Sequence, residues 1–181
     1  MENDANCMAI AESNALSADV TADVLCLTYG TCVGGAIVHG GAVYHGANWS
    51  AGEFGMIYMN GEYYENIASV TRLVEQAKAM DASLCDGRAI TAQLNRSDVY
   101  ALVDGWAKQV AEGLASLIHI FNPACMIIGG GIMENKDVFN MVTSKVSELT
   151  APGFDINIRS ARFGNSAGLI GAGILAQKLI K

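Results

Sequence analysis

The chain has 181 residues, of which 51% are hydrophobic and 16% are charged, with a net charge of −7 and a pI near 4.8. This length allows one domain with a full-sized core, and the high apolar content argues against intrinsic disorder. The acidic balance and the scattered Lys and Arg argue against nucleic acid as a partner, because phosphate binding needs clustered cations.

The sequence shows no sign of a membrane or secreted protein. No apolar run approaches the roughly 20 residues of a membrane span, and the acidic N-terminal stretch does not read as a signal peptide. The five cysteines are odd in number, far apart and without CxxC spacing, which predicts neither a disulfide framework nor a zinc site. We therefore expect a protein of the reducing cytoplasm that does not bind membranes.

Periodicity and the positions of Gly and Pro predict a helix, a β-meander, two helices, and then alternating strands and helices. In chain order, helices are expected at residues 5–18, 66–80, 98–121, 136–149 and 167–181, and strands at 23–29, 33–39, 42–44, 126–128 and 156–158. This order of elements predicts a mixed α/β domain.

Two polar residues, Asn3 and Asp4, stand directly before the first predicted helix. An Asn or Asp in this position normally caps the helix, because its side-chain oxygen accepts a bond from a free N–H group. Capping explains one of the two residues and leaves the other unexplained.

Two glycine clusters follow predicted strands. The first comprises Gly30, Thr31, Gly34 and Gly35, and the second Gly129, Gly130 and Gly131. In the first, exposed N–H groups and a hydroxyl could hold phosphate oxygens, although a tight hairpin needing positive φ explains the glycines equally well. No Gly-Lys-Ser/Thr follows to make a P-loop. The second lies between a strand and a helix, where nucleotides often bind, but lacks the GxGxxG pattern.

Four polar residues would together suit a sugar: Asn3, Asp4, Glu53 and Glu65. Carboxylates and amides hold the vicinal hydroxyls of sugars by accepting and donating hydrogen bonds. For Glu53 the alternative is a solvated loop acid, and for Glu65 it is a first-turn partner of a helix dipole. Sequence spacing does not show whether the four side chains converge.

Read together, these segments resemble the ROK family (repressor, open reading frame, kinase), whose kinases phosphorylate hexoses. The opening ENDAN is similar to the family's sugar-site motif, and AGEFG (51–55) to its AGExG motif. LTYGTCVGGAI (27–37) resembles the phosphate-binding LGTGVGGGI stretch, with Tyr29 and Cys32 as departures. Asn122-Pro123 with IIGGGI (127–132) resembles the segment beside the adenosine, and FGNSAGLIG (163–171) the closing-helix signature. The resemblance spans essentially the whole chain.

The resemblance implies a fold, an activity and roles for the motif residues. The implied fold is the actin-like, ribonuclease H-like α/β domain, a mixed sheet with helices on both faces. The implied activity is phosphorylation of a hexose or related sugar by ATP with Mg²⁺. Asp4 would be the catalytic base, and Asn3, Glu53 and Glu65 would bind the sugar. Gly30, Thr31, Gly34 and Gly35 would hold phosphates, and Gly129, Gly130 and Gly131 would pack against the adenosine.

The sequence departs from the family pattern in two ways. It contains no DxGGT loop, so residues 1–181 are expected to be the single C-terminal domain of such a protein, without its N-terminal lobe. Such a chain alone is expected to be a poor kinase and, because apolar surface is uncovered, a homo-oligomer. Met56 and YMNGEYYE (58–65) stand where the family has a His and a cysteine cluster, so no structural zinc is expected.

Two alternatives to a kinase remain open. One is the sugar-sensing domain of a ROK-type transcriptional regulator, and the other is a sugar-binding or structural module that does not catalyse. The presence of Asp4 favours the kinase. The sugar also remains open among glucose, fructose, N-acetylmannosamine and β-glucosides.

Overall fold

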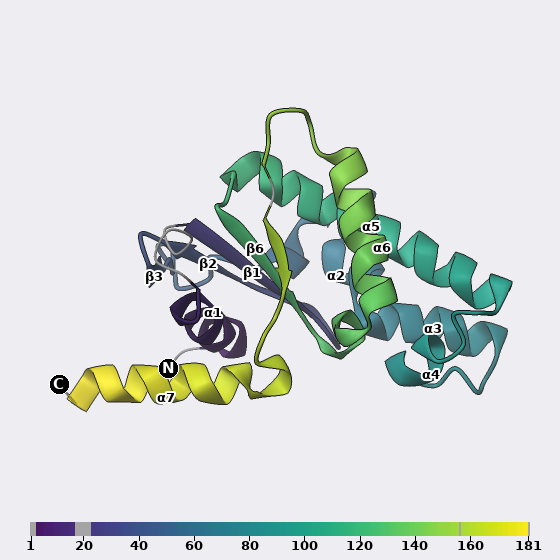
Figure 1. The fold of residues 1–181 in the computed structure, drawn as a ribbon, viewed down its shortest axis with the longest axis horizontal. Coiled ribbons are helices and arrows are strands. Elements are labelled where there is room, and N and C mark those ends of the chain that lie inside the picture. The colour runs from purple at the N-terminus through teal and green to yellow at the C-terminus, as the bar shows by residue number, and fades with distance from the viewer. Residues whose placement is uncertain (1–2, 17–22, 156, 181) are drawn as a thin grey trace.

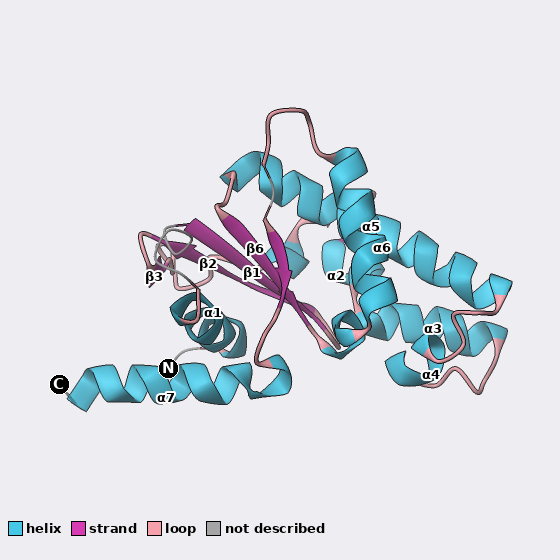
Figure 2. Ribbon diagram, viewed as in Figure 1, coloured by secondary structure: helices cyan, strands magenta, loops and turns pink. Residues whose placement is uncertain are grey.

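A computed structural model describes residues 3–16, 23–155 and 157–180, which form a sheet with helices on both faces (Figures 1 and 2). The helices are α1 (Asp4–Asn14), α2 (Tyr64–Ala68), α3 (Val70–Met80), α4 (Gly87–Thr91), α5 (Ser97–Phe121), α6 (Lys136–Leu149) and α7 (Ala167–Ile180), with short 3₁₀ helices η1 (Phe54–Met56), η2 (Gly131–Glu134) and η3 (Gly164–Ser166). The strands are β1 (Asp23–Tyr29), β2 (Val33–His39), β3 (Ala42–Val43), β4 (Tyr58–Met59), β5 (Glu62–Tyr63), β6 (Cys125–Gly129) and β7 (Ile158–Ser160). The predicted mixed α/β class is confirmed.

The main sheet has the strand order β3-β2-β1-β6-β7. Strand β1 pairs antiparallel with β2 and parallel with β6, so that Thr28 lies between Gly34 and Gly129. Because parallel strands end at the same edge of a sheet, the glycines that follow β1 and β6 come side by side. The pairing of β1 therefore joins the two glycine clusters that the sequence separates by about 100 residues.

Strand β1 is buried on both faces, because helices cover both sides of the sheet. Leu25, Leu27 and Tyr29 point into a large core completed by α2, α3, α5 and α6. Val24 and Cys26 point into a smaller core completed by α1 and α7. Figure 1 shows α1 and α7 together on one side of the sheet, and α5 and α6 on the other.

A buried aromatic cluster stabilises the centre of the large core. The hydroxyl oxygens of Tyr29 and Tyr64 lie 2.7 Å apart, and the Tyr64 hydroxyl donates to the Val110 carbonyl at 2.8 Å. Trp106 Nε1 donates to the Ala68 carbonyl at 3.0 Å, and its ring lies edge-on to Tyr29. Burial raises the pKa of both tyrosines, so both hydroxyls stay neutral. The cluster joins the end of β1 to α2 and α5.

Three predicted elements differ from the structure by more than one residue at an end. The helix expected at 66–80 is two helices, because Ser69 has an extended ψ of 155° and caps α3 by accepting from the Arg72 N–H. The first helix ends at Asn14, earlier than expected, and residues 17–18 of that prediction lie outside the described residues. The last strand begins at Ile158, two residues later than predicted. Residues 156 and 181, the ends of two predicted elements, also lie outside the described residues.

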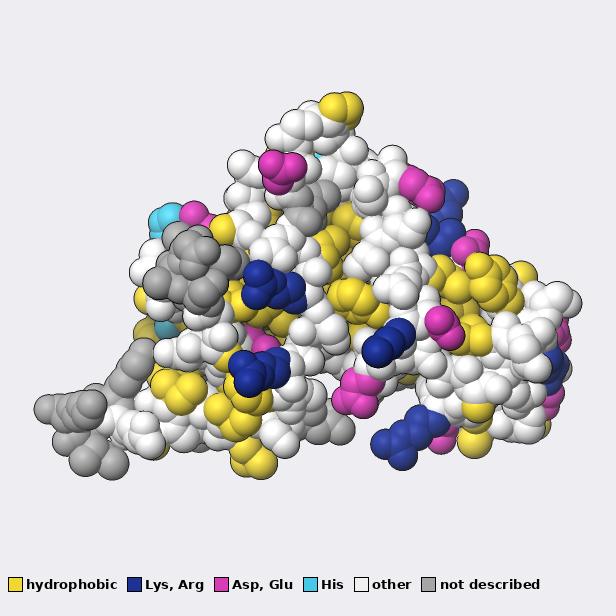
Figure 3. Space-filling view, viewed as in Figure 1, with side chains coloured by type: hydrophobic (Ala, Val, Ile, Leu, Met, Phe, Trp, Pro, Cys, Tyr) yellow, Lys and Arg dark blue, Asp and Glu magenta, His cyan; other side chains and the backbone are white. Residues whose placement is uncertain are grey.

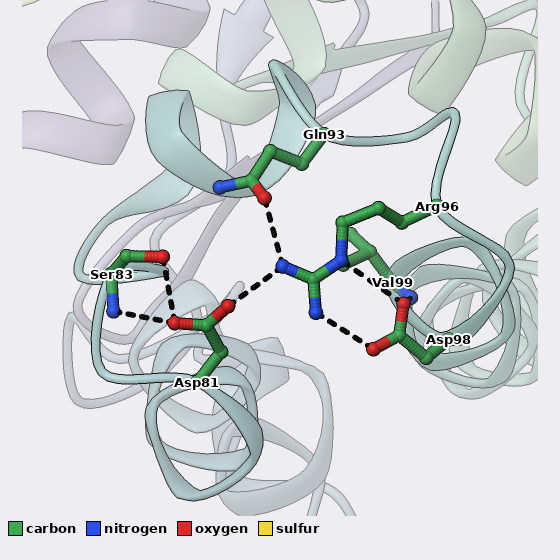
Figure 4. A network of polar contacts seen from close by, with 6 residues as sticks. All are labelled: Asp81, Ser83, Gln93, Arg96, Asp98 and Val99. Atoms are coloured by element: carbon green, nitrogen blue, oxygen red, sulfur yellow. Dashed lines mark hydrogen bonds and ion pairs between the residues drawn. The ribbon is translucent and has the colours of Figure 1, made fainter.

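A polar network ties together the ends of α3, α4 and α5 (Figure 4). Arg96 Nη1 donates to Asp81, the C-cap of α3, at 2.7 Å and to Gln93, just after α4, at 2.9 Å. Arg96 Nε and Nη2 donate to the two carboxylate oxygens of Asp98, in the first turn of α5, at 3.2 and 2.8 Å. Ser83 adds two bonds to Asp81, at 2.9 and 2.7 Å. One guanidinium thus closes the loop that carries α4.

Gly113 of α5 provides the space for the Tyr64 ring. A methyl group at position 113 would collide with that ring, whereas one at Gly105 of the same helix would meet no atom within 4 Å. We expect Gly113→Ala to lower the free energy of unfolding by about 1–3 kcal/mol through overpacking. We expect Gly105→Ala to raise it by roughly 0.5–1 kcal/mol, because helical glycine loses more backbone entropy on folding. Urea unfolding followed by circular dichroism measures both changes, and an equal effect of the two substitutions would contradict this account.

Acid should weaken the fold through the Arg96 network. The hydrogen bond from Arg96 is the largest cause that lowers the pKa of Asp81, to about 2. Such a carboxylate stabilises the fold above its unfolded pKa of about 3.9, and this contribution is lost as the pH falls toward the folded value. We therefore expect the free energy of unfolding to fall between about pH 4 and about pH 2, and to fall less in Asp81→Asn. Urea titrations across this range test it, and parallel profiles for the two proteins would count against it.

Candidate functional site

Helix α1 points its N-terminus toward the turn between β1 and β2. Near its start, the Ala5 Cβ lies 3.6 Å from where a methyl group on Gly34 would be. Near its end, Asn14 lines a small cavity together with Val43 of β3. The partial positive charge of the helix N-terminus is therefore directed at the edge of the sheet where the glycine clusters lie.

The two polar residues at the start of the chain have different positions on α1. Asn3 is the N-cap, and its Oδ1 accepts from the Asn6 N–H at 2.7 Å. Asp4 is the first helical residue, and its Oδ1 accepts from the Ala5 N–H at 3.0 Å. Both side chains are exposed. Capping by Asn3 leaves Asp4 as a surface carboxylate at the positive end of a helix, and the Asn3 amide keeps its two N–H donors.

Glu53 lies in a loop that packs closely against β2. Gly52 has a φ of +93°, and a methyl group there would lie 2.9 Å from the Gly35 carbonyl oxygen. Phe54 fills the space over Gly35, which a side chain would otherwise occupy. Only glycine at positions 35 and 52 permits this approach, which leaves Glu53 exposed just before η1. Gly35 therefore has a packing role that does not depend on phosphate.

Glu65 lies at the start of α2 and is half-buried. Its Oε2 is 3.1 Å from the place of a methyl group on Gly55, so Gly55 brings it against the AGEFG segment. Glu65 also lines a cavity of about 490 Å³ together with Thr31 and Cys32 from the β1–β2 turn. The Glu65 carboxylate raises the pKa of the Cys32 thiol, which keeps that thiol protonated.

The four residues expected to hold sugar thus lie around one end of β2. Ala5 of α1 packs near Gly34, the loop of Glu53 packs on Gly35, and the Gly55 segment beside Glu65 packs on the Val33 carbonyl. Glu65 and Thr31 share a cavity, whereas Asn3, Asp4 and Glu53 are exposed outside it.

A second cavity, of about 350 Å³, opens where β1 and β6 end. It is within the size range of small-molecule sites, about 300–1,000 Å³. Its polar lining comes from both glycine clusters, from α4 and from η2: Gly30, Gly131, Asp86, Arg88, Thr91 and Glu134. The cavity therefore combines the two glycine clusters, which were expected to bind nucleotide, with α4, for which no such role was expected.

Different structural constraints require glycine at the positions around this cavity. Gly130 has a φ of +108°, and a methyl group there would collide with the Tyr29 carbonyl. Gly129 is buried, and a methyl group on it would lie 2.8 Å from the Met8 Cε. Gly130 lets β6 turn into η2 directly beside β1, which places Gly131 in the cavity lining, whereas Gly129 leaves space for Met8 of α1. The Gly30 N–H donates to the Cys32 carbonyl at 3.0 Å, so it is engaged in the turn and not directed at a ligand.

Sequence reasoning did not identify α4. The helix has five residues, too few to show apolar periodicity. Its local signal is Asp86, which caps it by accepting from the Ala89 N–H at 2.8 Å. An Asp followed by glycine is a common turn sequence, and nothing in it points to a cavity.

Charged side chains of both signs are mixed over the visible surface. Over the face in Figure 3, Lys and Arg side chains stand among acidic and uncharged groups and form no continuous patch. Within residues 3–16, 23–155 and 157–180, no helix has the length and apolar content needed to cross a membrane. In the same residues, no group of three or more His, Cys, Asp or Glu is placed to hold a metal ion.

The sequence is similar to those of sugar kinases. A model of the ROK family matches residues 1–179. The β-glucoside kinase of Listeria innocua is 31% identical over 186 residues, covering 95% of this chain and 62% of the relative. The glucokinase of Halalkalibacterium halodurans is 29% identical, covering 98% of this chain and 63% of the relative. The chain thus spans somewhat less than two thirds of the length of these relatives.

Solved structures show the same fold. The ROK hexokinase of Thermus thermophilus superposes with a TM-score of 0.87 at 29% identity, covering 99% of this chain and 65% of that one. A Streptomyces griseus glucokinase in complex with glucose and AMPPNP gives 0.82 at 26% identity, with coverages of 98% and 68%. A ROK transcriptional regulator homologous to the E. coli MLC protein gives 0.83 at 22% identity, with coverages of 98% and 51%, a likeness of fold alone. The chain has the expected actin-like α/β fold, and it belongs to the ROK family.

Proposed function

We propose that this chain forms the catalytic part of an ATP-dependent sugar kinase, in which Asp4 is the general base. The observation that carries the proposal is the position of Asp4: an exposed carboxylate at the N-terminus of α1, directed at the edge of the sheet where both glycine clusters lie. The names of the relatives add support, because they are sugar kinases, and one structural neighbour holds glucose and an ATP analogue.

In this mechanism the Asp4 carboxylate accepts the proton of the attacking sugar hydroxyl as the new P–O bond forms. Asn3, Glu53 and Glu65 bind and orient the sugar from around the end of β2. Orientation and electrostatic stabilisation supply most of the catalysis in phosphoryl transfer. The N-terminus of α1 stabilises the negative charge that develops on the attacking oxygen.

The nucleotide would occupy the 350 Å³ cavity between Gly30 and Gly131. Thr31, the next residue after Gly30, lines the cavity beside Glu65, and its hydroxyl would donate to phosphate from that side. Mg²⁺ is commonly held by the phosphates, water and one or two carboxylates, and it neutralises phosphate charge. Asp86 and Glu134 are the carboxylates that line this cavity, so the residues present fit that ion. Gly34, Gly35, Gly129 and Gly130 would act by letting backbone segments approach one another.

The proposed substrate is a hexose or a related sugar. The activity assay below distinguishes among glucose, fructose, N-acetylmannosamine and β-glucosides. A sugar-sensing regulator is the second candidate, since the same fold occurs in a ROK regulator. A regulator needs sugar binding but no base, so the two candidates differ at Asp4.

Asp4→Asn tests the base in the natural protein that contains this chain. Asn has nearly the same shape as Asp and stabilises the start of a helix about as well as Asp does, but its side chain accepts no proton at neutral pH. We expect kcat to fall by about 10²–10⁴-fold while the KM for sugar changes little. A coupled assay of ADP release across the candidate sugars measures both constants.

The matched control is Asp137→Asn, which removes a first-turn acid from α6, another helix capped by Asn. This control should leave kcat unchanged. Wild-type turnover in Asp4→Asn would overturn the catalytic mechanism and favour the regulator. The sugar role of Asn3 is tested with Asn3→Ser, because Ser keeps the N-cap that Asn3→Ala would lose.

We also propose that the protein is a homo-oligomer. Support comes from an apolar cavity of about 320 Å³ beside the end of α5, where Ile120 is 69% exposed and Phe121 is 39% exposed. Ile120→Ser should shift the sedimentation coefficient toward the monomer, because polar side chains at an interface lose apolar burial. Tyr100→Ser, at the other end of α5, should leave it unchanged. A wild-type protein that sediments as a monomer at high concentration would contradict the proposal.

A further inference from the structure

We propose that α4 is the wall of the nucleotide cavity that recognises the nucleotide's phosphates, with Arg88 as the contact residue and Arg96 as the positioning residue. The inference rests on the proposed kinase function and adds a part of the site that none of the family motifs in this sequence covers.

Arg88 has the chemistry for such a contact. Among the described residues that line the cavity it is the one Lys or Arg, and it is exposed. Its guanidinium makes no ion pair with another described residue, although Asp86 and Glu134 line the same cavity. A guanidinium binds phosphate through two parallel N–H donors, which a Lys ammonium cannot do. An arginine that lies beside Gly30 and Gly131, with no ion pair among the described residues, is therefore placed to meet a polyphosphate.

Helix α4 cannot hold its own position, because a five-residue helix has too few internal hydrogen bonds to be stable. Packing fixes its inner face. Ile90 is fully buried, and a methyl group on Gly87 would lie 3.8 Å from both Ile132 and Val70, which line the cavity. The helix is thus seated against η2 and the start of α3.

The Arg96 network fixes the two ends of the loop that carries α4 (Figure 4). The guanidinium bridges Asp81, before α4, and Asp98, after it, and also bonds Gln93. A planar guanidinium can serve these partners at once, whereas Lys offers a single charged atom. Without this bridge the ends of the loop separate, and Arg88 loses its fixed place relative to Gly30. Arg96 is exposed to solvent by about a third and lines no part of the cavity, so its effect on a nucleotide passes through α4.

The first test measures ATP binding by isothermal titration calorimetry with Mg²⁺ at low salt, in the same natural protein as the Asp4→Asn assay. Arg88→Gln should weaken binding about tenfold, the scale of one lost charged hydrogen-bonding partner, and the loss should shrink as salt is added. Arg159→Gln is the charge-matched control, since Arg159 lies on β7 and bonds its neighbour Asn157. It should leave the ATP affinity unchanged. Melting temperatures without ligand confirm that each variant is folded.

A double-mutant cycle tests the positioning role. Arg96→Lys alone should weaken ATP binding about three- to tenfold, but it should add little in the Arg88→Gln background, because both changes act on one contact. Independent, additive losses would mean that Arg96 acts only on stability, and they would overturn its positioning role.

The outcomes separate this inference from the proposed function. If the wild type binds ATP and the Arg88→Gln variant binds it as tightly as the Arg159→Gln variant does, α4 does not bind the phosphates. The kinase proposal is unaffected by that result. If wild type binds no ATP even at millimolar concentration, the nucleotide half of the proposed function is overturned, and this inference with it. A tenfold loss confined to Arg88→Gln supports both.

Discussion

Close contact between backbone segments around β1 is the constraint on which the rest of this structure depends. Gly130 lies against the Tyr29 carbonyl, and Gly52 lies against Gly35, at distances that no side chain permits. These contacts bring the β6–η2 turn and the Glu53 loop onto the end of the β1–β2 hairpin. These glycines therefore act chiefly by having no side chain, which lets the backbone segments approach closely. The polar groups of the site lie on those segments.

The buried interior supports the same edge of the sheet. Tyr29 is the last residue of β1, and its hydroxyl meets Tyr64, the residue immediately before Glu65. The hairpin that carries Thr31 and the helix that carries Glu65 are thus joined through the core, two residues before Thr31 and one residue before Glu65. The departure of Tyr29 from the family pattern is consistent with this packing, since an aromatic hydroxyl needs a buried partner.

Around the cavity where β1 and β6 end, charge adds to close packing. Helix α4 is short, and Arg96 holds its flanks through two carboxylates and an amide. A second arginine, Arg88, makes no ion pair with any other described residue and lines the cavity itself. The surroundings of the two cavities therefore differ: glycine contacts along β2 shape the one beside Glu65, whereas at the other a guanidinium that closes a loop adds to the glycine contact at Tyr29.

The sequence alone determined the elements with long, regular patterns and the motifs that identify the family. The strands at β1 and β2, the long helix α5 and the AGEFG and GGG motifs were predictable, because burial periodicity and glycine runs are local signals. Tertiary structure alone decided which polar groups meet. It assigned capping to Asn3 and left Asp4 exposed, it engaged the Gly30 N–H within the turn, and it brought α4 to the cavity. The first two are local hydrogen bonds, but several local pairings compete for the same groups and only the folded backbone selects one of them. The third depends on contacts between residues far apart in the chain, and a five-residue helix shows no apolar periodicity by which the sequence could predict it.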